Sequence, residues 1–270
     1  MLLRITLPQD KITRWPQIAL DHATSGQATH KELEKLIGEL SFAQTSVFGR
    51  FGRALLKPLH GKLKERPYSE QLSDRERDIL MWWAQSLRET IPRAISTKPT
   101  NREFIIYTDA ATSTKAVAAL LLEVEEFDSV PCFEELRADA SEPGWETTFI
   151  NTTYIYGLEM IAIAATVLVL GERLRGKNVT FYIDSSNCRD ALVRGKTDTK
   201  VIDNLVKLFW AHIQRLGINA WFEVIPSGLN PADAPTRDSP SPIKVKKSRS
   251  FGISKALRIW LDSEIRGNHQ

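Results

Sequence analysis

Residues 104–109 have the sequence FIIYTD, and residues 179–184 have the sequence VTFYID. Both stretches are rich in β-branched and aromatic residues and both end in an aspartate. This pattern predicts two buried strands, each with a carboxylate at its C-terminal end. Burial removes water from a carboxylate, and neighbouring carboxylates repel each other unless a cation binds among them. The two stretches therefore predict a sheet with an acidic end that attracts cations.

Two further acidic residues extend this pattern. Glu159 lies near the start of a helical run at residues 156–163, and Asp233 ends a turn at residues 227–233 that follows a strand-like run. The four candidate ligands are Asp109, Glu159, Asp184 and Asp233. Four carboxylates in the order strand, helix, strand and late loop predict a cluster that binds two divalent metal ions, which indicates hydrolysis of phosphodiester bonds.

The second half of the chain alternates between strands and helices. Strands are expected at residues 103–109, 116–124, 179–184 and 220–225, with another near 133–136 inside an acidic, irregular stretch at 125–143. Helices are expected at residues 154–174, 186–193 and 199–216. Three strands, a helix, a strand, two helices and a last strand predict a mixed α/β sheet flanked by helices.

The first 95 residues have mainly helical patterns. Residues 1–28 are mixed, whereas Thr29 with Glu32 and Ser73 with Glu76 form capping boxes that predict two helix starts. We expect a helical region at residues 1–97, an α/β domain at 101–237, and a basic linker with a C-terminal helix at 238–270. The linker is expected at 238–250 and the helix at 254–265.

Charge is unevenly distributed along the 270 residues. The net charge is +5 for residues 1–100, −7 for 101–236 and +5 for 237–270, within a total of +3. An acidic module between basic ends fits a metal-dependent catalytic domain whose flanks hold a polyanion, although ordinary surface charge gives the same totals. The linker lysines and arginine predict a solvated segment, with phosphate contacts or a nuclear address as alternatives. They are Lys244, Lys246, Lys247 and Arg249.

The sequence contains no membrane or secretion signal. The longest apolar run, at residues 160–170, is too short to span a bilayer, and the N-terminus lacks the apolar stretch of a signal peptide. Cys132 and Cys188 have no metal-ligand spacing and are expected to be reduced thiols. We therefore expect an intracellular protein, cytoplasmic or nuclear, with no membrane partner.

Four motifs carry a resemblance to a known family. They are YTDA at 107–110, GLE at 157–159, YIDSSN at 182–187 and NPADAPTR at 230–237. Together they resemble the ribonuclease H domain of retroelement polyproteins, of the retrotransposon and pararetrovirus type. Upstream, residues 30–43 and Gly52-Arg53 resemble the thumb and connection that follow a reverse transcriptase palm. The resemblance covers about residues 5–237.

The resemblance implies a fold and a chemistry. The implied fold is a ribonuclease H-like mixed five-stranded sheet flanked by helices, preceded by a small helical thumb/connection-like domain. Asp109, Glu159, Asp184 and Asp233 would be catalytic and would bind two Mg²⁺ ions, for which Mn²⁺ would substitute. One ion would lower the pKa of the attacking water and the other would stabilise the leaving 3′-oxygen. The implied substrate is the RNA strand of an RNA–DNA hybrid, and the implied protein partner is a reverse transcriptase polymerase domain or subunit.

Substrate contacts are implied by the same resemblance. Where the family often has a glycine-rich turn after the first aspartate, this chain has ATSTK at residues 111–115, and Ser227 stands where related enzymes often have a histidine. The candidate substrate-binding residues are Thr112, Ser113, Lys115, Asn187, Ser227, Asn230, Arg237, Arg50 and Arg53.

Two other functions are compatible with the sequence. The first is a domesticated nucleic-acid-binding or scaffold protein that keeps a ribonuclease H fold with little or no turnover. The second is a DNA-directed nuclease, such as a resolvase or transposase, which the motif at residues 230–237 disfavours.

Overall fold

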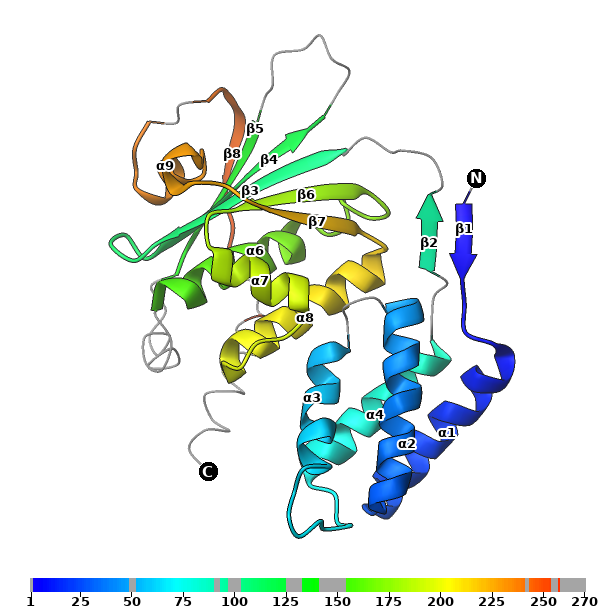
Figure 1. The fold of residues 1–270 in the computed structure, drawn as a ribbon. Helices are drawn as coiled ribbons and strands as arrows, with labels where there is room; N and C mark the ends of the chain where they lie inside the picture. The colour runs from blue at the N-terminus through cyan, green and yellow to red at the C-terminus, as the bar shows by residue number, and fades with distance from the viewer. Residues whose placement is uncertain are drawn as a thin grey trace. The chain divides into compact units, whose positions relative to one another are not determined.

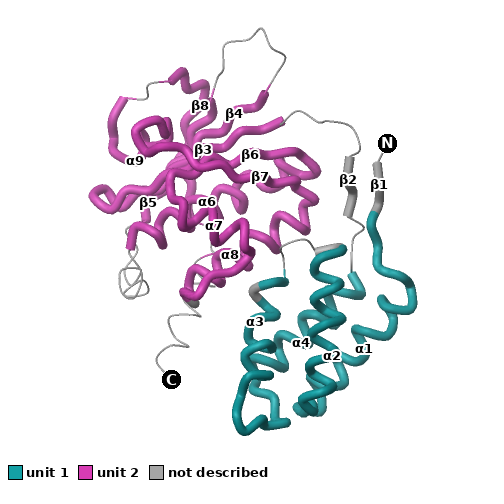
Figure 2. Tube along the Cα trace, in the orientation of Figure 1, with its two compact units in different colours: residues 1–99 teal, residues 100–270 magenta. Residues whose placement is uncertain are grey.

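The computed structural model describes residues 2–48, 52–89, 93–96, 103–124, 133–140, 154–240, 243–253 and 257. The chain divides into two compact units, residues 1–99 and residues 100–270 (Figure 2). The predicted C-terminal helix at 254–265 and the candidate residue Arg50 lie outside the described residues, apart from Leu257.

The first unit is a helical bundle with a small two-stranded sheet (Figure 1). Its elements are β1 (Leu2–Ile5), α1 (Gln9–Ser25), α2 (His30–Ala43), a π-helix (Gln44–Phe48), α3 (Arg53–Lys62), α4 (Asp74–Arg88) and β2 (Arg93–Ser96). The predicted capping boxes at Thr29 and Ser73 are confirmed, and each begins a helix. Antiparallel pairing joins β1 to β2.

Helix α1 differs from the mixed conformation expected for residues 1–28. Pro16 lies inside the helix, and the buried face is formed by Trp15, Ala19 and Ala23, where α1 packs on α4. A proline inside a helix removes one backbone hydrogen bond, and alanines give a weak apolar signal. Packing on α4 therefore stabilises a helix that the sequence pattern does not indicate.

The second unit is built on a six-stranded mixed sheet. Its strands are β3 (Phe104–Ala111), β4 (Ala116–Glu123), β5 (Phe133–Asp139), β6 (Asn178–Ile183), β7 (Asn219–Val224) and β8 (Val245–Ser250), in the spatial order β7-β6-β3-β4-β5-β8. Strands β3, β4 and β5 are antiparallel, β6 and β7 run parallel to β3, and β8 runs parallel to β5. The predicted mixed sheet flanked by helices is confirmed, with one strand more than expected.

Three helices pack on one face of this sheet: α6 (Tyr154–Leu170), α7 (Ser186–Arg194) and α8 (Lys200–Leu216) (Figure 1). Helix α6 is apolar around much of its circumference, and the sheet and α8 both cover it. A short 3-10 helix (Ser227–Leu229) and α9 (Asp233–Thr236) follow β7, and Ala232 packs with Leu120 and Phe133 in a separate small cluster. No helix among the described residues is long and apolar enough to cross a membrane.

The sixth strand corrects the prediction of a flexible linker at residues 238–250. Strand β8 pairs with β5, and the amide of Phe251 donates to the carbonyl of Arg137 at 2.8 Å. Across this pair Arg249 contacts Glu134, and the hydroxyl of Ser248 donates to Glu135. The sequence VKKSRS has no apolar alternation because this edge strand lies in solvent. Residues 245–250 are extended because their backbone pairs with the otherwise open edge of β5.

Candidate active site

Asp109 and Asp184 lie next to each other where the parallel pairing of β3 with β6 ends. Thr108 and Ile183 are partners in the β3–β6 register, so the next residue on each chain is one of these aspartates. Asp109 is only 5% exposed. Burial raises the pKa of Asp109 to about 7; a hydrogen bond from Thr236 opposes this shift, and the charges of Asp184 and Asp233 add to it.

Thr236 ties the last motif to this strand end. Its hydroxyl donates to Oδ2 of Asp109 at 2.5 Å, although the two residues are 127 positions apart. The carbonyl of Thr236 accepts a hydrogen bond from the hydroxyl of Thr114 at 2.5 Å. Thr236 therefore joins α9, the end of β3 and the β3–β4 turn.

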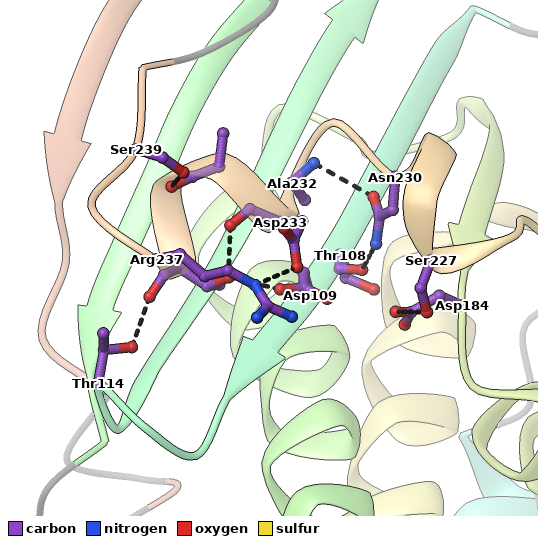
Figure 3. A network of polar contacts seen from close by, with 12 residues as sticks. Thr108, Asp109, Thr114, Asp184, Ser227, Asn230, Ala232, Asp233, Arg237 and Ser239 are labelled. Carbon is purple, nitrogen blue, oxygen red and sulfur yellow. Dashed lines mark hydrogen bonds and ion pairs between the residues drawn. The ribbon is translucent and has the colours of Figure 1, made fainter.

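Asp184 keeps one oxygen without a partner. Its Oδ2 accepts a hydrogen bond from the hydroxyl of Ser227 at 2.9 Å (Figure 3), whereas Oδ1 is buried and has no hydrogen-bond partner among the described residues. A buried carboxylate oxygen without a donor loses its hydrogen bonds to water and gains no hydrogen bond from the protein. It is the oxygen of this cluster that most needs a further positive partner.

Glu159 reaches the cluster from helix α6. Burial raises the pKa of Glu159, a hydrogen bond with Ser185 lowers it, and the charge of Asp184 raises it. The thiol of Cys188, at the start of α7, lies 3.7 Å from Oε2 of Glu159. Cys188 is fully buried, and burial raises the pKa of its thiol well above the usual value. At ordinary pH this thiol is therefore a neutral neighbour of Glu159.

Asp233 is more accessible than the buried Asp109. It begins α9, its side chain is 35% exposed, and its Oδ1 accepts from Nε of Arg237 at 2.6 Å (Figure 3). The guanidinium of Arg237 also lowers the pKa of Asp109. Arg237 therefore places one positive charge beside two of the carboxylates.

The four carboxylates are electrostatically connected. Asp109 is affected by Asp184 and Asp233, and Glu159 is affected by Asp184. Within the described ranges, no three His, Cys, Asp or Glu side chains are arranged as they stand to hold one ion. Three of the carboxylates are turned toward neighbours of their own: Asp109 toward Thr236, Asp184 toward Ser227 and Asp233 toward Arg237. The donor set itself, carboxylate oxygens with one buried oxygen unpartnered, is the chemistry that Mg²⁺ prefers.

The candidate substrate-binding residues divide into groups. Thr112 and Ser113 are exposed in the β3–β4 turn, where Lys115 has a left-handed φ of 50°. Asn187 is exposed in the first turn of α7, which begins two residues after Asp184. Ser227 and Arg237 contact the carboxylates directly. Arg53 belongs to the first unit, where it begins α3.

The side chain of Asn230 is buried and therefore not accessible to a substrate. It is 5% exposed, its amide nitrogen donates to the carbonyl of Thr108 at 2.9 Å, and its amide oxygen accepts from the amide of Ala232 (Figure 3). Both polar groups of the side chain are used inside the protein. Asn230 therefore positions the 227–233 turn against β3, which corrects the assignment of this residue to substrate contact.

Sequence reasoning missed several residues that shape the site. Thr236 lies inside the motif at 230–237 but was not a candidate, and Thr114, Ser185 and Cys188 were not candidates either. A hydroxyl three residues after Asp233 was a usable signal, since that spacing places both residues on one helical turn. Nothing in the sequence pairs Cys188 with Glu159, because that contact depends on how α7 packs against α6.

Comparison with known proteins adds little to this description. No protein-family model matches the chain, and no curated protein matches it. Among solved structures, ribonuclease H1 from the archaeon Halobacterium salinarum NRC-1 is similar to 50% of this chain over 97% of its own length, at 16% identity and a TM-score of 0.32. Two structures of foamy viral protease-reverse transcriptase with double-stranded DNA are similar at 12% identity, with TM-scores of 0.30 and 0.31. This chain covers 34% and 42% of their lengths.

The fold assignment rests on the strands of this chain, since TM-scores at that level support no further argument. Three antiparallel strands, a helix and two parallel strands added beside the first strand form a ribonuclease H-like sheet. The class defined by fold and site is a ribonuclease H-like α/β protein with four electrostatically connected carboxylates, two near strand ends and two on helices.

Proposed function

We propose that this protein is a metal-dependent endoribonuclease that cleaves the RNA strand of RNA–DNA hybrids. The observation that carries the proposal is the buried acidic cluster, in which Asp109 and Asp184 lie at adjacent strand ends and Asp184 keeps an unpartnered oxygen. Such a cluster is costly to hold without a cation, because burial and mutual repulsion both act against the charged forms.

The residues that would hold two Mg²⁺ ions, or Mn²⁺ in their place, are Asp109, Glu159, Asp184 and Asp233. When bound, the ions would activate a water molecule and stabilise the leaving oxygen. The chain's own residues prepare the site: Thr236 orients Asp109, Ser227 orients Asp184, and Ser185 holds Glu159. Substrate contacts are proposed for Thr112, Ser113, Lys115, Asn187 and Arg237. Arg237 would turn from Asp233 toward a phosphate, which it matches in charge and geometry.

We also propose a relation to retroelement reverse transcriptases. The motifs at 107–110, 157–159, 182–187 and 230–237 support it, as does the sequence of the helix at 30–43. Residues 1–97 would be a thumb/connection-like region, and residues 101–237 with the added strand β8 would be the nuclease domain. A polymerase domain or subunit would be the protein partner, and the place of action would be the cytoplasm or the nucleus.

The test is a cleavage assay with three labelled substrates. RNA–DNA hybrid, duplex DNA and duplex RNA are each incubated with Mg²⁺ or with a chelator. We expect Mg²⁺-dependent cutting of hybrid RNA alone, reduced at least about 10³-fold by Asp184→Asn, a loss of about 4 kcal/mol of transition-state stabilisation. Asp190→Asn is the matched control, since Asp190 pairs with Arg189 and Arg194 on α7. Cutting of duplex DNA, or full activity of Asp184→Asn, would refute the proposal.

A second function is favoured by one feature of the cluster. Asp233 already has a cation, the guanidinium of Arg237, and Asp109 and Asp184 already have hydroxyl donors. A domesticated nucleic-acid-binding or scaffold protein would keep such an internally paired site. Binding of hybrid without cutting in the same assay would support this second function.

A further inference from the structure

The strand β8 and the end of β5 border a hollow that the candidate active site does not use. The hollow has a volume of about 670 Å³. Its lining comes from residues 113–116 in the β3–β4 turn and at the start of β4, 137–139 of β5, and 250–252 at the end of β8 and just after it. The lining includes the hydroxyls of three residues, the cationic side chains of Lys115 and Arg137, and one carboxylate, that of Asp139. The hydroxyls belong to Ser113, Thr114 and Ser250. An open, polar hollow with cationic groups suits an anionic ligand better than an apolar one.

The start of β8 and the residue before it carry positive charge that no described residue neutralises. Lys244, Lys246 and Lys247 are exposed, and no ion pair joins any of them to another described residue. By contrast, Arg249 pairs with Glu134, and Arg137 pairs with Asp238. The three lysines are therefore available to an outside anion, although residues 101–236 of the same unit carry a net charge of −7.

The sheet register relates β8 to the acidic cluster. Asp109 is the partner of Ala118, Ala118 of Arg137, and Arg137 of Ser250, so one row crosses four strands. Side chains in such a row point to the same face of the sheet. Three strand spacings of about 4.8 Å place the end of β8 about 14 Å from the strand position of Asp109. Two contacts brace this row, Thr114 with Thr236 and Arg137 with Asp238.

We propose that β8 and the hollow bind the sugar–phosphate backbone of a nucleic-acid duplex beyond the point of cleavage. The position of the cleavage point relative to β8 rests on the proposed function, whereas the binding of a duplex at β8 does not. A span of about 14 Å equals about four steps of 3.4 Å along one strand. The contact is made through charge and hydroxyl groups, so it is independent of base sequence. The basic C-terminal strand thus supplies the attraction for a polyanion that the acidic nuclease domain lacks.

The test compares two double variants of the full chain. Lys246→Gln with Lys247→Gln removes two charges from β8. Arg175→Gln with Lys177→Gln is the control, because it removes two charges from the same unit just before the start of β6, at the opposite end of the strands from Asp184. Fluorescence anisotropy with labelled hybrids of about 24 and about 8 base pairs is measured in chelator, where no cutting occurs, from low to moderate salt.

We expect the β8 variant to bind the long hybrid about tenfold more weakly at low salt. The slope of log affinity against log salt concentration should fall by about 2, since each lost phosphate contact removes about 0.9. The control variant should stay within about twofold of the natural chain. The same direction of loss is expected with the short hybrid, which at about 27 Å still spans the roughly 14 Å to β8. Lys244→Gln, whose side chain lies just before the strand, should weaken binding in the same direction without changing the β5–β8 pairing.

Equal affinities and equal salt slopes for the β8 variant and the natural chain on both hybrids would overturn the inference. The outcome is separate from the fate of the proposed function. A natural chain that binds hybrid through β8 but never cuts it would refute the nuclease and leave this surface in place. If the natural chain cuts hybrid with Mg²⁺ and the β8 variant binds hybrid as tightly as the natural chain does, the nuclease proposal stands and the β8 surface is refuted.

Discussion

Strands β3 and β8 run in the same direction in one sheet, and their surroundings are opposite. In β3, Phe104, Ile106, Thr108 and Asp109 are all buried, and the strand has a partner on each side. In β8, five of the six residues are exposed, and the strand forms the edge of the sheet. Burial of its side chains therefore stabilises the central strand β3, whereas backbone pairing and a few ion pairs stabilise the edge strand β8.

The largest expected effect breaks the central strand. Ile106→Ala removes a side chain with no exposed surface from the core between the sheet and helix α6. We expect a loss of about 2–5 kcal/mol in the free energy of unfolding, measured by urea denaturation. Val245→Ala in β8 is the matched change at the edge, where about 1 kcal/mol or less is expected. Similar losses at both positions would contradict the contrast between the two strands.

A medium effect comes from the buried charge at the end of β3. The pKa of Asp109 is raised from 3.8 to about 7, so the folded chain binds a proton more tightly than the unfolded chain does. Without metal, stability should therefore fall as the pH rises from about 4 to about 7. Asp109→Asn should remove this fall and raise Tm at pH 8 by at least about 2–4 °C, or about 1 kcal/mol, with little gain at pH 4.

Calorimetry in chelator measures this difference, and Mg²⁺ should then reverse it. A metal that binds the folded state raises Tm by mass action, so the natural chain should gain more from Mg²⁺ than Asp109→Asn does. Glu172→Gln is the control, because that carboxylate is 75% exposed in its pair with Arg175. A Tm of Asp109→Asn below that of the natural chain at pH 8 would show that the hydrogen bond to Thr236 outweighs the cost of the buried charge.

The smallest expected effect is at the edge. Arg249→Gln removes one of two arginines that contact Glu134, and Arg173 remains. Because Arg249 is partly exposed, we expect a loss of less than about 1 kcal/mol that shrinks further at high salt. Urea denaturation at two salt concentrations measures it. A loss as large as that of Ile106→Ala would mean that this ion pair, rather than backbone pairing, holds β8 in the sheet.

Much of the second unit was predictable from local patterns. Runs of β-branched and aromatic residues indicated β3 and β6, and a long apolar run indicated α6. The adjacency of Asp109 and Asp184 followed from their places at strand ends. In the first unit, capping boxes indicated the starts of α2 and α4, because a glutamate follows Thr29 and Ser73 at a spacing of three residues.

Other elements were outside the reach of local patterns. Helix α1 contains Pro16 and buries alanines, and β8 has the composition of a solvated linker. Asn230 has a polar side chain of the kind that binds ligands, yet its amide group makes hydrogen bonds within the protein. In each case the conformation depends on a surface supplied by a distant part of the chain: α4 for α1, β5 for β8, and Thr108 for Asn230.

The sequence by itself determined the order of strands β3 to β7 and of the helices between them, and the places of the four carboxylates along the chain, because these depend on residue periodicity and on residues that follow one another. Only the tertiary structure decided which partner each carboxylate has. Thr236 reaches Asp109 across 127 positions and Ser227 reaches Asp184 across 43. Packing selects these donors, since a hydroxyl's partner is set by what lies within about 3 Å of it in space and not by its neighbours along the chain.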